Sequence, residues 1–412
     1  MSKTVYIVAA KRTAVGKAKK GGFAKTRPDE LLADLIKHTV KQSKVDSNDI
    51  ADVVMGCAFP EAQQGQNIAR IAALLAGLPN TVPGITVNRY CSSGLNSIAY
   101  AANMISLGQA EVVVAGGIES MSLIPMGGND WSVSPEVFKN NDVAIAFGMG
   151  ITAENVAKQW GVSRNEQDKF SLESNQRAIN AINSGYFKDE IHPVEITHSS
   201  PCEKTGKVVE KKIVVDTDEC PRSDTSIEAL AKLKPAFASK GTVTAGNSSQ
   251  MSDGAGCLVL VSENYLKKHN LIPLAKFLGF AVSGVAPEIM GIGPVKAIPK
   301  VLEQTKLDLK QIDWIELNEA FAAQSIAVIN DLKLEPSKVN PCGGAIAMGH
   351  PLGATGAVLA TKLIHGLRRT GKKYGMVAMC IGTGMGAAGV FENILLDVHH
   401  QKGENNNNNN NK

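Results

Sequence analysis

The sequence predicts an α/β protein built from two similar halves with a large segment inserted between them. The 412 residues include 39 glycines but only 5% aromatic residues, a balance typical of proteins with many tight strand-to-helix turns. Short β-rich runs alternate with longer helical patterns, and the order of these runs in the first half recurs in the second. A chain of this length is too long for one simple core, so two or three domains are expected.

The first half alternates strand and helix patterns. The expected elements are a strand over 5–10, a helix over 28–43, a strand over 51–59, a helix around 67–76 and a strand over 111–117. The helix pattern of 28–43 carries acidic residues in its first turn, where they interact favourably with the helix dipole. The run 111–117 is continuously apolar and ends in glycine, as expected for a buried strand.

Three segments of the second half match segments of the first in the same order. The matches pair 50–59 (IADVVMGCAF) with 312–321 (IDWIELNEAF), 86–91 (TVNRYC) with 338–343 (KVNPCG), and 110–117 (AEVVVAGG) with 374–384 (YGMVAMCIGTG). Each match is weak alone, but three in order indicate two similar α/β halves. Between them, residues 122–251 are more polar, with helical patterns over 154–184 and 226–233, and an insertion of this kind is the usual place for a ligand-specific lid.

Charge and cysteine content restrict the possible functions and compartment. The net charge of +4, without a basic stripe interleaved with aromatic residues, argues against nucleic acid but suits a phosphate-bearing small molecule. The 7 cysteines include no CxxC pair, so neither a zinc knuckle nor a thioredoxin-type site is indicated. An odd count, without a signal peptide or an apolar run of membrane-spanning length, predicts a cytoplasmic protein with no membrane insertion. The asparagine run 405–411 predicts a disordered tail, which does not end in a Ser-Lys-Leu-type peroxisomal tag.

Cys91 lies in the stretch NRYCSSGLNSIAY (88–100), just before a helical pattern. Apolar residues recur at helical spacing from Leu95 onward, so Ser92 and Ser93 are expected to be the cap and first turn. At such a position free N–H groups and the helix dipole favour a thiolate and can also hold an oxyanion. The alternative is that Cys91 is a small, inert apolar residue, and this segment alone leaves both open.

Three further segments place reactive residues at expected strand ends or helix starts. Asn318 and Glu319 follow the apolar strand 314–317, where an asparagine is more often a helix cap. His350 lies in the glycine-rich stretch NPCGGAIAMGHPLGATGA; a lone histidine is usually structural, but one in a glycine-built hairpin is a better general-base candidate. Cys380 ends a strand before alternating glycines, for which a phosphate-binding nucleotide site is the competing interpretation.

Together, Cys91, Asn318, His350 and Cys380 resemble the reactive set of the thiolase family. The motifs that carry the resemblance span about residues 3–395 and are NRYCSSG, GGIESMS, AKLKPAF, GTVTAGNSSQMSDGA, NEAFA, GGAIAMGHPLGATGA and CIGTGMGAAG. The resemblance implies a five-layered α/β/α/β/α fold from two duplicated halves with an inserted loop domain. The implied divisions are an N-terminal half over 1–121, completed by about 252–273, a loop domain for CoA over 122–251, a C-terminal half over 274–396 and a tail over 397–412.

The resemblance also implies reversible Claisen chemistry on acyl-coenzyme A. Cys91 would attack the 3-keto carbon and become acylated as the acetyl-CoA enolate departs, Cys380 would protonate that carbanion, and free CoA would then remove the acyl group. His350 would activate Cys91 and, with a water held by Asn318, stabilise the enolate oxygen. The N–H groups of Cys91 and Gly382 would form a second oxyanion hole. Splitting a C–C bond independently requires a covalent acceptor, an acid at the leaving carbon and a place for enolate charge.

Coenzyme A is expected as a co-substrate, with no permanently bound cofactor and no metal. By resemblance, Ser249 would lie near the pantetheine, and Arg222 with the stretch 233–237 would flank the adenine and phosphates. Leu233 and Phe237 could instead belong to the core of the loop domain. The expected binding residues are Arg222, Leu233, Ala236, Phe237, Ser249, Met149 and Phe321.

The residues before TAENVA (152–157) indicate a branch of the family. Biosynthetic acetoacetyl-CoA thiolases tend to have a Tyr-His-Met-Gly stretch there, whereas this chain has Gly148 in place of that histidine and keeps Met149. The small residue resembles the degradative branch and would leave room for a longer acyl chain, although Tyr90 could narrow the acyl pocket. We therefore expect a β-oxidation 3-ketoacyl-CoA thiolase, with acetyl-CoA C-acetyltransferase as the alternative. A homodimer or homotetramer is expected, as is usual in this family.

Other classes fit less well. A ketoacyl-ACP synthase shares the implied fold but resembles a Cys-His-His site, whereas Cys380 stands here in place of the second histidine. A non-enzymatic binding module would lack at least one of the four site residues, and none is missing. A metal held by Cys91, His350 and Cys380 is conceivable on ligand chemistry, but glycine-flanked N–H donors suit an oxyanion better than a cation.

Overall fold

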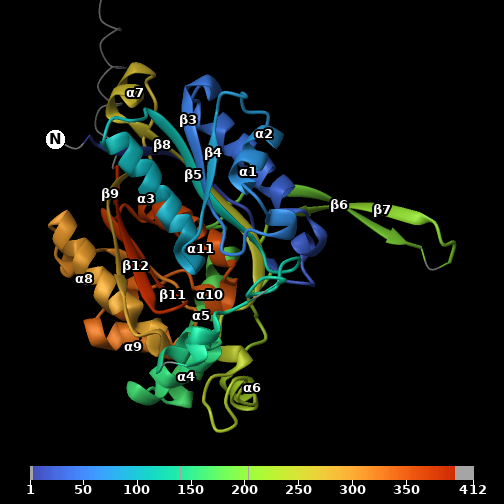
Figure 1. Cartoon of the computed structure of the whole chain (residues 1–412), viewed down its shortest axis with the longest axis vertical. Helices are drawn as coiled ribbons and strands as arrows, with labels where there is room; N and C mark the ends of the chain where they lie inside the picture. Colours follow the sequence, from blue (N-terminus) through green and yellow to red (C-terminus); the bar gives the residue numbers. More distant parts are fainter. Residues whose placement is uncertain (1–2, 131, 140, 203, 395–412) are drawn as a thin grey trace, which may run out of the picture.

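The computed structural model describes residues 3–394 except 131, 140 and 203 (Figure 1). Its strands are β1 (Val5–Arg12), β2 (Gly16–Lys17), β3 (Ile50–Gly56), β4 (Gly84–Val87), β5 (Val112–Ser120), β6 (Val194–Pro201), β7 (Val208–Val215), β8 (Ser252–Ser262), β9 (Ala275–Gly284), β10 (Trp314–Leu317), β11 (Tyr374–Ile381) and β12 (Met385–Asn393). Its α-helices are α1 (Pro28–Ser43), α2 (Ile68–Leu75), α3 (Ser93–Ser106), α4 (Met149–Gln159), α5 (Arg164–Asn183), α6 (Ile227–Ala231), α7 (Glu263–Lys268), α8 (Gly293–Thr305), α9 (Ala322–Leu332), α10 (Ala345–Met348) and α11 (Leu352–Thr370). The predicted tail, 397–412, lies outside the described residues.

The strand order repeats within one ten-stranded sheet. The first half contains the order β3-β5-β8-β1, and the second half contains β10-β11-β12-β9. In both orders the first pair of strands is parallel and the next two pairs are antiparallel. β4 runs parallel to β3, and its counterpart is an isolated parallel bridge between Ile315 and Val339. The duplication predicted from three sequence matches is confirmed, because each matched pair of segments occupies the same place in its half.

The helices and the two halves of the sheet together form five layers (Figure 1). α1 packs on the outer face of β1, β5 and β8, while α8 packs on the outer face of β9 and β12. α3 and α11 lie between the halves and contact each other as well as strands of the sheet. The predicted α/β/α/β/α arrangement is confirmed. Within the described sheet, the two halves pair where β1 meets β9, through three paired positions from Val5–Phe277 to Ile7–Ala275.

The two central helices cross with their backbones in contact. A Cβ atom on Gly94 of α3 would lie 2.8 Å from the Ala357 nitrogen of α11, and one on Gly356 of α11 would lie 2.2 Å from the Leu95 nitrogen of α3. Only glycine allows this approach. Since α3 begins just after Cys91 and α11 just after His350, the crossing fixes the two helix starts relative to each other.

The inserted segment contains α4, α5, α6 and a separate β6–β7 hairpin that extends away from the body (Figure 1). The single helical stretch predicted over 154–184 is wrong. The chain breaks between α4 and α5 at Gly161, with φ +66°, and restarts with a capping box in which Ser163 and Glu166 satisfy each other's backbone N–H groups. The hairpin was not predicted.

The core is continuous through both halves. The largest apolar cluster draws on β1, β3, β5 and β8 as well as α1, α3 and α11, and a smaller cluster lies between α8 and the strands of the second half. Across the described ranges, no helix combines the length and apolar character needed to span a bilayer.

Candidate active site

The four reactive residues singled out in the sequence lie where strands end or helices begin. Cys91 is in a 3-10 turn before α3, Asn318 follows β10, His350 lies between α10 and α11, and Cys380 is the second-last residue of β11. Two interpretations are corrected. Asn318 is not a helix cap, because Phe321 takes the N-cap position of α9, and His350 lies in a helix-to-helix connection rather than a hairpin.

The Cys91 thiol lies against a pair of backbone donors. Burial raises the pKa of Cys91 to about 11, against the lowering effect of hydrogen bonds from the N–H groups of Gly382 and of Cys91 itself. Desolvation and the two backbone donors therefore act on the Cys91 pKa in opposite directions, as the donors at this helix start were expected to lower it while burial raises it. Ser92 and Ser93 do occupy the cap and first-turn positions, although the Ser92 side chain makes no capping bond. Two N–H groups converging at one point are what an oxyanion hole requires.

His350 is held as a neutral imidazole. It is 5% exposed, and burial lowers its pKa to about 4. Its Nδ1 lies 2.6 Å from the Thr355 hydroxyl and its Nε2 lies 3.3 Å from Asn318 Nδ2. Because an amide nitrogen only donates, Nε2 is the acceptor and Nδ1–H donates to Thr355. The unprotonated Nε2 is thus free to take a proton, as a general base must.

Thr355 was missed as a functional residue, although it stands in the quoted motif. Its position on the first turn of α11, five residues after His350, was the available signal. The His350 N–H also donates to the Gln250 carbonyl at 3.0 Å, so both the ring and the backbone of the histidine are anchored.

Cys380 is a buried acid beside the same site. It is 1% exposed, and its pKa is raised by burial and by its proximity to Cys91. It packs in an apolar cluster that includes Val243 and Phe321, with Met149 against the edge. A thiol in such surroundings stays protonated at neutral pH and can supply a proton. Cys91 is half-buried, whereas Asn318, His350 and Cys380 are all buried, so Cys91 is the member of the set most open to a ligand.

Glu119 was also missed, and it braces the elements around Cys91. Its carboxylate is 1% exposed and accepts the N–H groups of Ala58 and Gly353, both at 2.8 Å, together with the Gln64 side chain. These bonds tie the end of β5, the loop after β3 and the start of α11 to one point. Burial raises the pKa of Glu119, while the bonds from the N–H groups act to lower it.

Some of the expected binding residues lie next to the reactive cysteines, and others lie nearer the protein surface. Met149 sulfur lies 3.5 Å from where a Cβ on Gly382 would stand, which places it against the oxyanion donor. Phe321 is buried beside Cys380, and the exposed Phe237 ring meets Phe321 edge-on with centroids 6.1 Å apart. Phe237 also presses on Gly150 of α4, where a Cβ would lie 2.1 Å from the ring.

The outer binding residues are accessible. Leu233 is 39% exposed and Phe237 is 43% exposed, so the alternative that they belong to the loop-domain core is wrong. Ala236 is also exposed and donates its N–H to the Val243 carbonyl, while the Ser249 N–H donates to the carbonyl of Ala320. Arg222 is exposed and pairs with Asp224 at 3.4 Å, and the structure shows no contact that brings it to the reactive residues.

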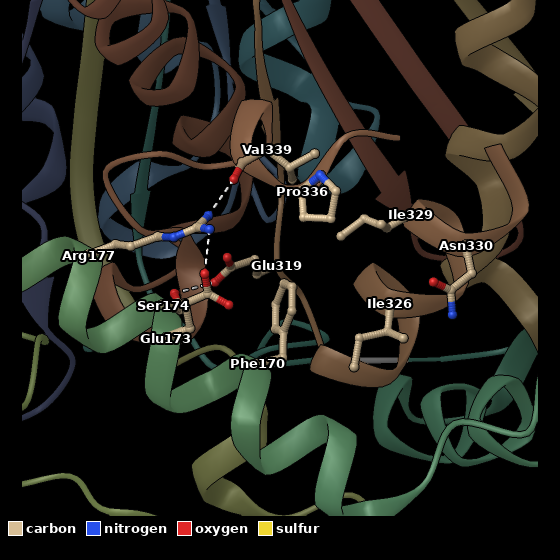
Figure 2. Close-up of a pocket in the computed structure, with 10 residues that line it drawn as sticks. All are labelled: Phe170, Glu173, Ser174, Arg177, Glu319, Ile326, Ile329, Asn330, Pro336 and Val339. Atoms are coloured by element: carbon tan, nitrogen blue, oxygen red, sulfur yellow. Dashed lines mark hydrogen bonds and ion pairs between the residues drawn. The ribbon is translucent and has the colours of Figure 1, made fainter. Parts of the chain in front are cut away.

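A cavity of about 140 Å³ lies between α5 and α9 (Figure 2). Phe170 and Ser174 of α5 face Ile326 and Ile329 of α9 across it, with Glu319 between them. Cys91, His350 and Cys380 do not line it. Within the described ranges, no group of three or more His, Cys, Asp or Glu side chains is arranged to hold a metal ion.

Comparisons with known proteins agree with the fold and the motifs. A family model described as thiolase, N-terminal domain, matches residues 5–264, and one described as thiolase, C-terminal domain, matches 271–393. A 3-ketoacyl-CoA thiolase of Bacillus subtilis (strain 168) is 52% identical over 397 residues, which cover 95% of this chain and 99% of that protein. Two solved structures, a Bacillus anthracis acetyl-CoA acetyltransferase and a human mitochondrial 3-ketoacyl-CoA thiolase, each have a TM-score of 0.85 and 40% identity, covering 95% of this chain and 99% of theirs.

Proposed function

This chain belongs to the thiolase family, and from that premise we propose that it cleaves 3-ketoacyl-CoA with CoA, yielding acetyl-CoA and a shortened acyl-CoA, in fatty-acid β-oxidation. The observation that carries the proposal is the grouping of chemically suited residues: the half-buried Cys91 thiol against the N–H groups of Gly382 and Cys91, Cys380 close to Cys91, and a buried His350 ring held by Thr355 and Asn318. Relatives named 3-ketoacyl-CoA thiolase reach higher identity than the acetyl-CoA acetyltransferase structure, so condensation of two acetyl-CoA molecules is the less favoured alternative.

The acyl-enzyme forms on Cys91. The Cys91 thiol transfers its proton to His350 Nε2 as its sulfur bonds to the 3-keto carbon, and the C2–C3 bond then breaks. Because the pKa of Cys91 is about 11 and that of His350 about 4, a stable thiolate–imidazolium pair does not form at rest, and the proton moves with the attack. The N–H groups of Cys91 and Gly382 stabilise the oxyanion, and losing one such donor typically costs about 10²–10³ in rate.

The electrons of the broken bond go to the acetyl-CoA enolate. In our proposal, His350 and a water held by Asn318 stabilise the enolate oxygen, and Cys380 gives its proton to the enolate carbon. The Asn318 oxygen is buried and makes no hydrogen bond to any described protein atom, so it is available to accept one from water. The thiol of free CoA then gives its proton to the Cys380 thiolate as its sulfur attacks the acyl-Cys91 carbonyl. The Cys91 sulfur leaves and takes back the proton held by His350, which returns both cysteines and the histidine to their starting states.

The acyl chain and coenzyme A have room in this arrangement. A Cβ built on Gly148 would meet no atom within 4 Å, which supports space for a longer acyl chain next to Met149. The exposed residues Arg222, Leu233 and Phe237 support a path for coenzyme A from the surface to Cys91. We further propose the loop-domain bounds 122–251, a homodimer or homotetramer, and a cytoplasmic location, all of which rest on the family resemblance and on composition.

Thiolysis of acetoacetyl-CoA against a medium-chain 3-ketoacyl-CoA tests the proposal, followed by loss of the ketoacyl enolate absorbance. We expect the longer substrate to be preferred; a strict preference for acetoacetyl-CoA would make the protein an acetyl-CoA acetyltransferase, and no turnover of either would refute thiolase activity.

Single substitutions distinguish the proposed roles of the two cysteines. Cys91→Ala is expected to abolish acyl-enzyme formation from acetyl-CoA, detected by intact-protein mass. Cys380→Ser is expected to acylate normally but to fail in C–C bond cleavage. Normal thiolysis by either variant would overturn the assigned roles.

A further inference from the structure

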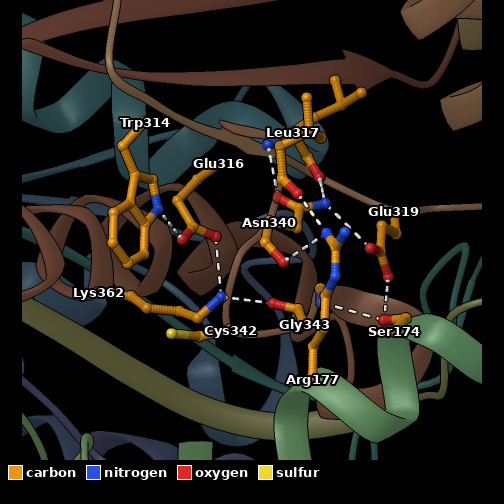
Figure 3. Close-up of polar contacts among 12 residues, drawn as sticks. Ser174, Arg177, Trp314, Glu316, Leu317, Glu319, Asn340, Cys342, Gly343 and Lys362 are labelled. Carbon is orange, nitrogen blue, oxygen red and sulfur yellow. Dashed lines mark hydrogen bonds and ion pairs between the residues drawn. The ribbon is translucent and has the colours of Figure 1, made fainter. Parts of the chain in front are cut away.

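Asn340 makes hydrogen bonds on both sides of Asn318 (Figure 3). Its Oδ1 accepts the Leu317 N–H at 2.9 Å, and its Nδ2 donates to the Leu317 carbonyl at 2.8 Å and to Glu319 Oε1 at 2.9 Å. The residue before Asn318 and the residue after it are therefore held by one side chain. Asn340 is 2% exposed and has φ +45°, a conformation that asparagine and aspartate adopt more readily than most residues.

Glu319 links this segment to two others. Its Oε2 accepts the Ser174 hydroxyl of α5 at 2.6 Å and the Ile346 N–H of α10 at 3.2 Å, as Figure 3 shows for the serine. α10 ends two residues before His350. A Cβ on Gly344 would lie 2.2 Å from the Glu319 carboxyl carbon, so the loop before α10 packs directly on this group.

The Asn318 side chain makes few contacts of its own that could fix its position. The Nδ2 contact with His350 is long, at 3.3 Å, and the Oδ1 atom has no partner among the described protein atoms. His350, in contrast, is anchored through Thr355 and Gln250. The position of the Asn318 amide relative to the imidazole must therefore be set by the backbone on either side of Asn318.

We propose that Asn340 and Glu319 form a positioning pair that sets the Asn318 amide against His350 for the carbon–carbon bond step. The pair touches neither the thiols nor the oxyanion donors, and although Glu319 also bonds Ile346 of α10, His350 is anchored separately through Thr355 and Gln250, so the pair acts mainly through Asn318. This inference rests on the proposed function, in which Asn318 serves the enolate while Cys91 and Gly382 serve acyl transfer. Disturbing the pair should slow carbon–carbon cleavage and leave acyl transfer to Cys91 largely intact.

Asn340→Asp and Glu319→Gln disturb the pair with almost no change of shape. Aspartate tolerates the positive φ at 340, but its second oxygen would face the Leu317 carbonyl and the Glu319 carboxylate, and acceptors facing acceptors repel. Glutamine at 319 either turns a donor toward Asn340 Nδ2 or loses its acceptor toward Ile346. Combining the two changes restores a donor–acceptor pair between the two side chains in the reversed direction, in which the new glutamine amide donates to the new aspartate. The repulsion at the Leu317 carbonyl remains, so the recovery is partial.

Two reactions of the same enzyme read out the effect. Exchange of labelled CoA into acetyl-CoA requires only acyl transfer through Cys91, whereas thiolysis of a 3-ketoacyl-CoA also requires cleavage of the carbon–carbon bond. We expect Asn340→Asp to lower kcat for thiolysis by about 10²-fold, the effect of a roughly 1 Å misplacement, with exchange reduced by less than about threefold. The double variant should recover at least about tenfold of the lost thiolysis.

A matched control is Asn330→Asp on the exposed face of α9, which should leave both reactions unchanged. Equal loss of exchange and thiolysis would show a general structural role and overturn the proposal, as would a double variant no better than the poorer single variant. Should Asn340→Asp not accumulate as folded protein, Glu319→Gln carries the same comparison from the other side of the bond. Absence of both reactions in the unaltered enzyme would instead refute the proposed function.

Discussion

Lys362 and Glu316 form a buried ion pair whose disruption has a predictable cost. Lys362 on α11 is 2% exposed, and its Nζ lies 2.8 Å from Glu316 Oε2 on β10 (Figure 3). The same Nζ donates to the Gly343 carbonyl, and Trp314 Nε1 donates to the other Glu316 oxygen at 2.8 Å. The pair therefore joins the central helix to the strand that leads to Asn318.

Replacing Lys362 by methionine keeps the unbranched shape of the side chain up to Cε but removes the ammonium group, which leaves the Glu316 carboxylate buried without a cation. At 2.8 Å and an effective dielectric constant of about 20, the Coulomb attraction is about 6 kcal/mol, most of which offsets the desolvation of the two charges. Breaking one partner of such a pair typically costs about 3–5 kcal/mol. With an unfolding entropy of about 2.1 cal/mol/K per residue, a chain of 412 residues loses about 3–6 °C in Tm.

Differential scanning calorimetry of Lys362→Met and of the double variant Lys362→Met, Glu316→Gln measures this cost. The double variant removes both charges, and we expect it to regain more than half of the lost Tm, since no unpaired charge remains buried. A single variant within about 1 °C of the unaltered protein, or a double variant less stable than the single one, would refute the reasoning.

Three further predictions follow from the site. The pKa of His350 is about 4 in the folded protein and near 6.5 in the unfolded chain, so its contribution to the free energy of unfolding is fully present above about pH 6.5. That contribution is lost, by up to about 3 kcal/mol, as the pH drops toward 4. Urea unfolding of the unaltered protein and of His350→Gln over this pH range checks the prediction. Gly150→Ala should displace the Phe237 ring, raising KM for CoA with little change in Tm. Hydrogen bonds from Thr205 lower the pKa of Cys202, so iodoacetamide at pH 7.5 should label Cys202 before Cys91, as peptide mass spectrometry would show.

The residues expected to take part in the reaction were predictable because each stands at the end of a local element. Cys91 precedes an apolar helical pattern and Cys380 closes an apolar strand, so a short window of sequence is enough to find both. The duplication was also readable, since matched strands keep matched residues. The raised pKa of Cys91 was not, because the burial that causes it depends on segments distant in the chain.

The groups that hold the site could not be predicted in the same way. Glu319 and Asn340 are 21 positions apart, and Glu319 and Ser174 are 145 apart, so no local pattern connects them. The break between α4 and α5 was different: its capping box stood in the sequence as Ser163 and Glu166, but helical periodicity on both sides hid it. Long-range polar contacts and the interrupted helix therefore departed from expectation, as did the β6–β7 hairpin and the local structure around Asn318 and His350.

The two halves share a repeated strand order and meet at the glycine crossing of α3 with α11, but they contribute different numbers of reactive residues. The first half contains Cys91, while the second contains Asn318, His350 and Cys380, so neither half holds all four of the residues proposed to react. We expect a chain that is cut between α7 and β9 to give two fragments, neither of which catalyses thiolysis alone. Their recovery of turnover on mixing would report directly on reassociation along the helix crossing and the short β1–β9 seam, which makes this architecture a natural complementation system.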